Sequence, residues 1–244
     1  MRTGIIIQAR MASSRLPGKI LTSICEKPLL WHLLERVKRT KGIDEIVVAT
    51  TTSACDEAVF NFCKEKRVRC FRGSEQDVLN RYNLCATHYH LDLIIRVTAD
   101  NPLTDPEGIE RLLERHRLSG ADYVHNKHRM GWPFGTGAEL ITSEALSFVT
   151  KEAKEQHHRE HVTLFIREHP ERFTLVKINA PDYLRRFEYY LTVDYPEDLT
   201  LMTILFHRLY NGNGPFSLCD AITYLDENPH LVKINTELHQ GFSE

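Results

Sequence analysis

The residues best suited to chemistry lie in a short loop near the start of the chain, directly after the apolar residues 5–7. Phosphate groups are bound by donors that converge from several directions: arginine offers a planar fork, lysine a point charge, and glycine lets backbone N–H groups come close. The loop supplies Arg10, Ser13, Ser14, Arg15, Gly18 and Lys19. Because the chain is nearly neutral, with 31 Lys+Arg against 33 Asp+Glu, the three cations are a local feature of this loop. The pattern predicts a phosphate site, with an ordinary exposed basic loop as the alternative.

Two aspartates that follow apolar runs are candidates for a metal site. Asp100 comes after the run at 91–98, and Asp194 after the run at 187–193. Ligands of open α/β sheets bind at the carboxyl ends of the strands, and Mg²⁺ commonly takes one or two carboxylates plus substrate phosphate oxygens. The pair therefore predicts a Mg²⁺–nucleotide site beside the loop. The alternative is that each aspartate only caps the helix that follows it, which is weaker for Asp100 because Asp105 is the better cap.

The elements that position these groups alternate along the first half of the chain. Short apolar runs predict strands at 5–7, 45–50, 68–71, 91–98 and 121–126. Amphipathic helices are expected between them, with start signals at Pro28, Ser53, Ser74 and Asp105. This alternation predicts an α/β protein with a mostly parallel, doubly wound sheet.

The second half of the chain has a different rhythm. A loop with three glycines and a proline is expected at 127–138, near the site. Strands are expected at 139–142, 173–178 and 187–193, and helices at 143–155, 158–168, from Pro196, and at 217–227. No repeat or Pro/Ser-rich linker interrupts the sequence, so we expect one domain over residues 1–244.

Composition limits the class of partner. A formal net charge of −2 and a pI near 6.7 argue against a nucleic acid or a membrane surface as the default partner. The sequence has no apolar run long enough for a signal peptide or a membrane span, and its six cysteines form no C-x-x-C pair, so we expect a cytoplasmic protein. The Gln156-His157-His158 run suggests a metal site, but histidines at a helix entrance are more often simply exposed.

Five motifs resemble a known family over nearly the whole chain up to about residue 210. They are I-I-Q-A-R-M-x-S-S-R-L-P-G-K at 6–19, G-S-E-x-D-V-L-x-R-Y at 73–82, R-V-T-A-D-N-P-L at 96–103, R-E-H-V at 159–162 and L-T-V-D-x-P-E-D-L at 191–199. Together they resemble the SpsF-like cytidylyltransferases, a group named for a spore-coat polysaccharide biosynthesis protein and related to the CMP-sugar synthetases. The resemblance implies a nucleotide-diphospho-sugar transferase (GT-A-like) fold. It also implies the Mg²⁺-dependent reaction of CTP with a sugar, acidic and of the ulosonate or nonulosonate type, to give CMP-sugar and pyrophosphate.

The resemblance also implies roles for individual residues. The triphosphate and its developing charge would be held by Arg10, Ser14, Arg15 and Lys19, of which the three cations are the candidate catalytic residues. The base and ribose would be held by Gln8, Ala9, Asp77 and Arg81, the metal by Asp100 and Asp194, and the sugar by Glu139, Arg159 and His161. Apart from the resemblance, the change of pattern in the second half leads us to expect that residues 127–190 form a lid over the acceptor or a dimer arm, and that the protein is a homodimer. Asp77 and Arg81 also have an ordinary interpretation as a helix-cap partner and a solvated helix residue, and Arg159 and His161 as charges at a helix start.

Two departures from the family pattern affect the acceptor side. Many relatives carry an acidic D-G-x-D-x-E run where this chain has residues 133–139, and only Glu139 keeps the acid, which suggests a more apolar acceptor pocket. T-A-D-N-P replaces the more usual T-G-D-C-P. The alternatives are a GT-A glycosyltransferase, whose D-x-D motif is absent, a nucleotidyltransferase that uses GTP or UTP, and a homologue that binds nucleotide without catalysis. The loop also lacks the upstream glycine of a P-loop NTPase.

Overall fold

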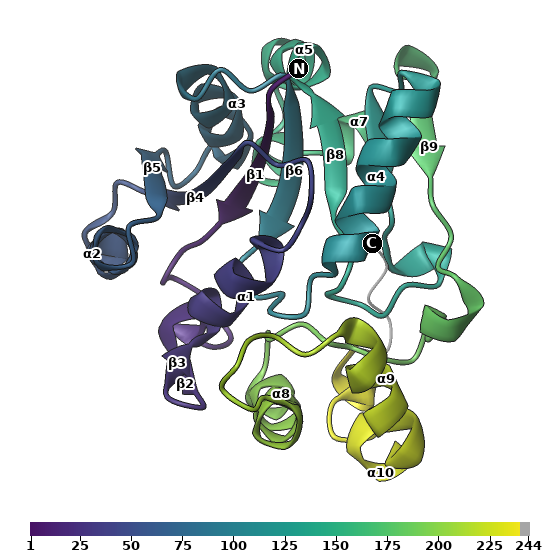
Figure 1. Ribbon diagram of the computed structural model, residues 1–244. Helices are drawn as coiled ribbons and strands as arrows, with labels where there is room; N and C mark the ends of the chain where they lie inside the picture. Colours follow the sequence, from purple (N-terminus) through teal and green to yellow (C-terminus); the bar gives the residue numbers. More distant parts are fainter. Residues whose placement is uncertain (240–244) are drawn as a thin grey trace.

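A seven-stranded sheet forms the centre of the protein in a computed structural model that describes residues 1–239 (Figure 1). Its strand order is β5 (Arg69–Gly73), β4 (Glu45–Thr51), β1 (Thr3–Gln8), β6 (Leu93–Thr98), β8 (Glu139–Thr142), β7 (Tyr123–His125) and β9 (Leu175–Lys177). β8 runs antiparallel to β6 and to β7, and the other pairings are parallel. The prediction of a mostly parallel α/β sheet is confirmed.

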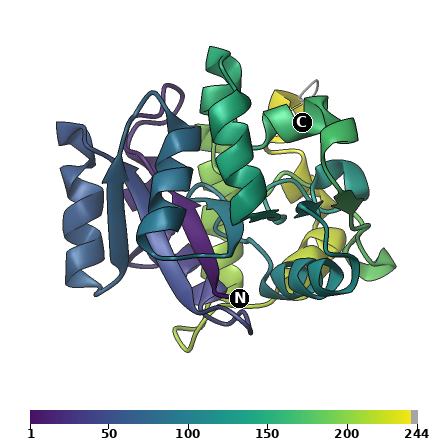
Figure 2. The same cartoon turned by 90° about the horizontal axis from the view of Figure 1, so that it is seen from above.

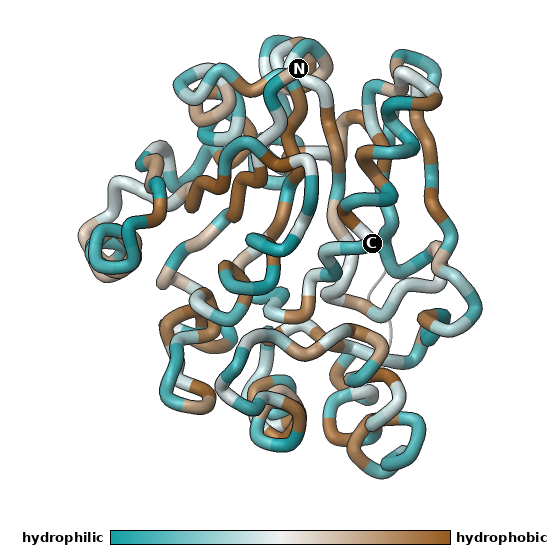
Figure 3. The backbone as a smooth tube through the Cα atoms, in the orientation of Figure 1, coloured by the Kyte–Doolittle hydropathy of each residue, from teal (hydrophilic) through white to brown (hydrophobic). Residues whose placement is uncertain are grey.

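Helices cover both faces of this sheet (Figure 2). Successive side chains of a strand point to opposite faces, so Ile5 and Ile7 pack with one set of helices and Ile6 with the other. The first set is α1 (Leu29–Val37), α2 (Glu57–Glu65) and α4 (Pro106–Ser119). The second is α3 (Val78–His88), α5 (Ser143–Glu152) and α7 (Leu164–Glu168), with α6 (Gln156–Glu160) beside α3. The central strand β1 carries a continuous apolar run, Ile5–Ile7, because both of its faces are buried, and Figure 3 shows hydrophobic segments along the centre of the molecule.

A third apolar cluster lies below the carboxyl ends of β1 and β6 (Figure 1). It is built by α8 (Pro196–Leu209), α9 (Leu218–Glu227) and α10 (Pro229–Val232), together with the hairpin of β2 (Ser23–Ile24) and β3 (Lys27–Pro28). 3-10 turns occur at Lys19–Leu21, Ala54–Asp56, His128–Met130, Pro170–Arg172, Asp182–Leu184 and Thr236–His239. This layer brings the chain before α8, which contains Asp194, against the loop that follows β1.

Several helix boundaries follow local signals in the sequence. Asp105 caps α4 by accepting the Gly108 N–H at 2.9 Å, with Pro106 in the first turn. The start of α3 lies later than expected, because Asp77 rather than Ser74 is its N-cap. Within residues 1–239, no helix combines the length and apolar character needed to cross a membrane.

Two expectations for the second half are wrong. Among the described residues 1–239, residues 187–193 form no strand of the sheet and make only one bridge, Phe134 with Tyr190. Their backbone instead bonds to the loop before β8, with the Leu191 N–H donating to the Phe134 carbonyl at 2.7 Å. The single helix expected at 158–168 is two short helices, α6 and α7, with Thr163 between them turned toward β8. In both places a tertiary contact overrides a plausible local pattern.

Candidate functional site

The basic loop after β1 folds back on itself and is tied to the sheet. The Met11 carbonyl accepts hydrogen bonds from the N–H groups of Ser13 (2.9 Å) and Gly18 (3.0 Å), and Gly18 has a φ of 75°, which favours glycine. The Met11 N–H donates to Asp56 Oδ1 at 2.6 Å. Asp56 is buried at the start of α2 and also accepts the Thr51 hydroxyl. These bonds give the cationic loop a defined position at the end of β1.

Lys19 lies between the two aspartates singled out by the sequence. Its Nζ is 2.9 Å from Asp100 Oδ2 and 2.7 Å from Asp194 Oδ1, and Arg15 Nη2 is 3.0 Å from Asp194 Oδ1. Lys19 is only 6% exposed, and burial alone would lower its pKa, but the two carboxylates outweigh burial and raise it. Burial opposes ionisation of Asp194 too, yet Lys19 and Arg15 hold the pKa of this carboxyl below its usual value. Lys19 and Asp194 therefore both stay charged at neutral pH.

These residues line a cavity of about 180 Å³, which we call the loop cavity. Its walls are Gln8, Arg10, Ser13, Ser14, Arg15, Lys19, Ile20, Thr98, Ala99, Asp100 and Asp194. Gln8 contributes a buried Oε1 that has no hydrogen-bond partner within residues 1–239. The structure thus brings the phosphate-type donors and both candidate metal ligands to one place.

A second cavity of about 320 Å³ adjoins the first, and we call it the histidine cavity. Its lining includes Arg96, Asn101, Lys127, His128, Pro133, Phe134, Ala138, Glu139, His161 and Thr192. The two cavities share Thr98, Asp100 and Asp194. Molecules held in the two cavities would therefore meet at the carboxylate pair.

Both aspartates are fixed by neighbouring groups. The Thr98 hydroxyl donates to Asp100 Oδ1 at 2.6 Å, which leaves Asp100 Oδ2 directed to Lys19. The main chain of Asp194 is held by Asp198, whose Oδ2 accepts the Asp194 and Tyr195 N–H groups at 2.8 Å each. Two oxygen-bearing side chains thus converge on one ammonium group, at the junction of the cavities. Such hard oxygen donors are the set that Mg²⁺ prefers, so Asp100 and Asp194 fit a magnesium ion.

Asp198 is itself held by residues far along the chain. Its Oδ1 accepts the Asn235 side-chain amide at 2.7 Å and His239 Nε2–H at 2.8 Å. Burial would raise the pKa of Asp198, but these donors and the two backbone N–H groups lower it. We call Asp198, Asn235 and His239 the C-terminal latch. Sequence reasoning missed Asn235 and His239, since neither lies in a local motif.

Glu139 borders the histidine cavity, but its carboxylate is already occupied. It is 2% exposed and accepts Thr163 Oγ1 at 2.6 Å, with Lys127 Nζ at 3.2 Å and the side chains of Arg96 and Tyr123 also in contact. Burial opposes its ionisation, but Lys127 and Arg96 keep its pKa well below the usual range. Glu139 therefore holds Arg96 and Lys127 in place on the wall of the histidine cavity. His161 lines the same cavity, and direct contact of Glu139 or His161 with a sugar stays a prediction.

Four other residues that the sequence suggested for substrate binding line neither cavity. Arg159 pairs with Asp77 and donates to the Thr150 carbonyl at 2.7 Å. Arg81 is fully buried; its Nη1 donates to the Ser74 carbonyl, while its Nε and Nη2 lack partners within residues 1–239. Ala9 uses its N–H in a 3.2 Å bond to Ala49. The structure therefore brings one predicted sugar ligand and one predicted nucleotide ligand, Arg159 and Asp77, to each other.

A larger hollow of about 890 Å³ lies between α1, α4 and residues 215–218. None of the candidate site residues lines it. Its size alone does not make it the reaction site, because the converging phosphate-type donors and the carboxylate pair are in the loop cavity.

Comparison with known proteins adds four findings. Residues 4–217 match the family described as Cytidylyltransferase. The chain is 35% identical over 230 residues to the spore coat polysaccharide biosynthesis protein SpsF of Bacillus subtilis, covering 92% of this chain and 94% of that protein. It is 37% identical over 120 residues to an 8-amino-3,8-dideoxy-manno-octulosonate cytidylyltransferase of Shewanella frigidimarina, about half of each chain. The structure superposes on that of a cytidylyltransferase from Leptospira borgpetersenii with a TM-score of 0.88 and 29% identity, covering 95% of this chain and 97% of the other.

Proposed function

This chain belongs to the cytidylyltransferase family, and we propose that it transfers CMP from CTP to a hydroxyl group of an acidic sugar, with release of pyrophosphate. The observation that carries this proposal is that two cavities meet at Asp100 and Asp194. The loop cavity offers cations to a triphosphate, and the histidine cavity offers room for an acceptor. The family is one of nucleotidyltransferases, so the glycosyltransferase and non-catalytic alternatives receive no support.

The reaction is an in-line displacement at the α-phosphorus of CTP. The sugar oxygen forms the new bond to phosphorus, the bond to the bridging oxygen of pyrophosphate breaks, and the hydroxyl proton passes to water. Arg10, Arg15 and Lys19 stabilise the negative charge that develops on the α-phosphate and the departing pyrophosphate. Mg²⁺, for which Asp100 and Asp194 are suited, would supply further charge neutralisation on the phosphate oxygens. Positioning and charge account for most of the rate, so no dedicated protein base is required.

Lys19 is prepared for this role before substrate binds. Its raised pKa keeps the ammonium group charged, although burial acts against it. A charge that is already buried and oriented needs little reorganisation as the transition state forms. The loop bonds to Asp56 and the αL turn at Gly18 hold the segment that carries it.

We propose an acceptor of the ulosonate or nonulosonate type. Support comes from the octulosonate cytidylyltransferase relative and from the basic groups of the histidine cavity, Arg96, Lys127 and His161. Phe134 and Ala138 add apolar surface where many relatives carry acids, which favours a sugar with a deoxy or otherwise apolar edge.

We also keep the expectation of a homodimer in which residues 127–190 act as a lid or an arm. Residues 139–142 and 175–177 of this segment are strands of the central sheet, so an arm would move with the domain. Light scattering after size-exclusion chromatography measures the mass directly, and a monomer of 28.3 kDa would contradict this expectation.

The proposed reaction is tested by incubating the protein with Mg²⁺, each of the four NTPs and a panel of acidic, amino and neutral sugars, with pyrophosphate release as the readout. We expect release with CTP and an acidic sugar. Asp100→Asn should reduce it to background with an unchanged circular dichroism spectrum. The control is Asp182→Asn, since Asp182 is highly exposed and lies outside both cavities. Full activity of Asp100→Asn would remove Asp100 from the site, and turnover of only neutral sugars would overturn the acceptor class.

A further inference from the structure

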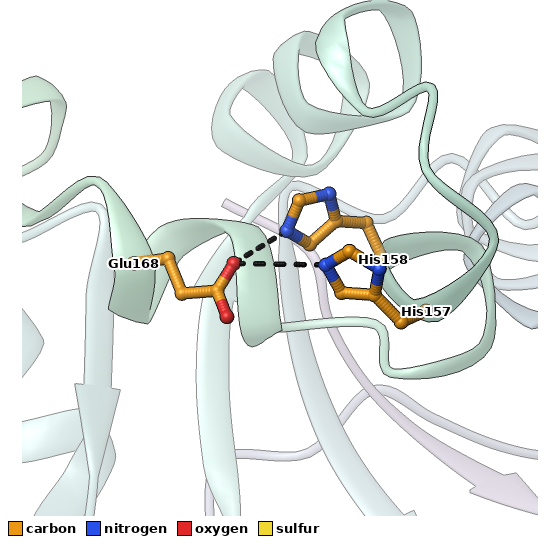
Figure 4. Close-up of side chains that lie close together, drawn as sticks. All are labelled: His157, His158 and Glu168. Atoms are coloured by element: carbon orange, nitrogen blue, oxygen red, sulfur yellow. Dashed lines mark hydrogen bonds and ion pairs between the residues drawn. The ribbon is translucent and has the colours of Figure 1, made fainter.

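A cluster of two histidines and a glutamate lies outside both cavities (Figure 4). His157 and His158 come from α6, and Glu168 is the last residue of α7. His158 Nε2 is 2.6 Å from Glu168 Oε2, and His157 Nε2 is 3.9 Å from the same oxygen. One ligand atom from each of the three residues lies within 4.8 Å of the others.

We propose that His157, His158 and Glu168 bind one Zn²⁺ ion. Imidazole nitrogen and carboxylate oxygen are common zinc ligands, whereas Mg²⁺ prefers oxygen alone, so this cluster and the Asp100–Asp194 pair select different ions. Two ligand atoms about 2.1 Å from a tetrahedral ion lie roughly 3.4 Å apart, which falls between the two separations observed here. Small side-chain adjustments would place all three atoms around one ion once the His158 ring proton, which lies on Nε2 in the hydrogen bond to Glu168, moves to Nδ1.

The surroundings suit a site that has one fixed ligand and two that can adjust. His158 is nearly buried, and its ring packs edge-on against Phe165 with the centroids 5.3 Å apart. The His157 and Glu168 side chains are 53% and 46% exposed, so an ion can enter from solvent and keep water as its remaining ligand. The sequence-based expectation of simple exposure therefore holds for His157 but not for His158.

The ion would join two helices whose connection reaches the acceptor side. Residues 161–163 link α6 to α7; His161 lines the histidine cavity, and Thr163 donates to Glu139 at 2.6 Å. An ion that holds α6 and α7 together would therefore also restrict the movement of the cavity wall at His161. An effect of zinc on the acceptor rests on the proposed function, but zinc binding itself does not.

The binding test uses the full chain, treated with EDTA and dialysed, and then titrated with Zn²⁺ in a calorimeter. Co²⁺ serves as a spectroscopic probe of tetrahedral coordination. We expect one Zn²⁺ per chain, unaffected by excess Mg²⁺. Affinity should fall at least about 100-fold in His157→Ala and in Glu168→Gln, since each loses a direct ligand. Both replaced side chains are exposed, so these variants are expected to fold normally.

The matched control is His207→Ala, because His207 is an exposed histidine on α8, far from the cluster in sequence. This variant should bind Zn²⁺ like the wild type. Equal zinc affinity in His157→Ala and the wild type would overturn the proposal, as would a visible Co²⁺ spectrum that survives Glu168→Gln. A zinc affinity lost in Asp100→Asn instead would assign the ion to the loop cavity and also overturn it.

The coupling test measures steady-state kinetics with and without Zn²⁺. We expect zinc to change the KM of the acceptor in the wild type but not in His157→Ala, and to leave the Kd of CTP unchanged in both. At 100 times its Kd, zinc should also raise the Tm of the wild type by roughly 5 °C. If no sugar is turned over, the proposed function fails while the titration still decides the zinc site. If the titration shows no zinc binding, the zinc proposal is wrong, and the pyrophosphate-release assay still tests the proposed function.

Discussion

The two cavities meet at the same carboxylates but are built in opposite ways. The loop cavity takes most of its charged lining from one segment of ten residues, Arg10 to Lys19, and completes it with two aspartates. The histidine cavity collects its lining from 96–101, 127–139, His161 and Thr192. One compact loop is enough for a substrate that all members of a family share. An acceptor site built from separate segments can instead be altered by substitutions in one segment while the other segments stay the same.

The use of charge differs as well. In the loop cavity, Lys19 and Arg15 neutralise carboxylates that themselves face the cavity. In the histidine cavity, Arg96 and Lys127 are bound to a buried Glu139. We therefore expect charge substitutions to affect catalysis on the first side and folding on the second.

The largest effect is expected for Lys19→Ala. It removes a buried ammonium group from the proposed transition-state site and leaves Asp100 and Asp194 facing each other, so kcat/KM should fall on the order of 10³-fold. Pyrophosphate release measures it, with Lys27→Ala on the exposed hairpin as the control. If the activity of Lys19→Ala stays within a few-fold of the wild type, the charges of the loop cavity do not determine catalysis and the comparison between the two cavities is wrong.

Glu139→Ala should act mainly on stability. It leaves Arg96, whose side chain is 18% exposed, without its carboxylate partner, and breaking a buried ion pair from one side typically costs about 3–5 kcal/mol, which is the upper limit for this partly exposed pair. Urea unfolding followed by circular dichroism measures the loss, and the Kd of CTP in the folded protein should not change. Glu139→Gln keeps part of the hydrogen bonding and should lose less. A fully stable Glu139→Ala with only a raised acceptor KM would instead favour direct sugar contact.

We expect the folding stability to depend on pH mainly through groups on the side of the histidine cavity. Burial lowers the pKa of His125, on β7 near Glu139, to about 4 from an ordinary value of 6.5. The unfolded chain thus binds more protons than the folded chain between these values. Stability is full above pH 6.5 and falls by about 3 kcal/mol as the pH drops to 4.

Unfolding by urea at a series of pH values tests this window. His125→Gln should reduce the slope of the unfolding free energy against pH. A smaller slope should remain, because burial also lowers the pKa of His32, which contributes in the same direction. The carboxyl of Asp194 has a lowered pKa and loses its contribution only below the ordinary aspartate range. A slope that His125→Gln leaves unchanged would place the sensitivity elsewhere.

The smallest effect is expected at the Arg159–Asp77 ion pair. Both side chains are partly exposed, so a double-mutant cycle with alanine should give a coupling of about 1 kcal/mol in unfolding free energy. Because neither residue lines a cavity, the Kd of CTP and the acceptor KM should stay within about twofold. A tenfold rise in either constant would restore the substrate contact that the resemblance implied.

The same contrast explains what the sequence could predict. The sheet could be predicted because β1, β4 and β6 each carry a run of mostly apolar residues. The loop and its two aspartates could be predicted because each follows such a run within two residues. The predicted strand at 187–193 fails because alternating apolar residues do not reveal whether a partner strand is available. Asp56 carries a helix-start signal but acts as the anchor of the loop. Such roles depend on contacts between residues distant in sequence.

The C-terminal latch has a consequence for the order in which the protein is made. The loop after β1, and β6 with Asp100, leave the ribosome while more than a hundred residues are still to be added. Asn235 and His239, which hold Asp198 and through it the backbone of Asp194, emerge more than two hundred residues later than the loop. Nascent chains can fold their earlier parts during synthesis. A chain released before residue 235 would therefore have the cationic loop but would lack the two side chains that hold Asp198 and, through it, the backbone of Asp194.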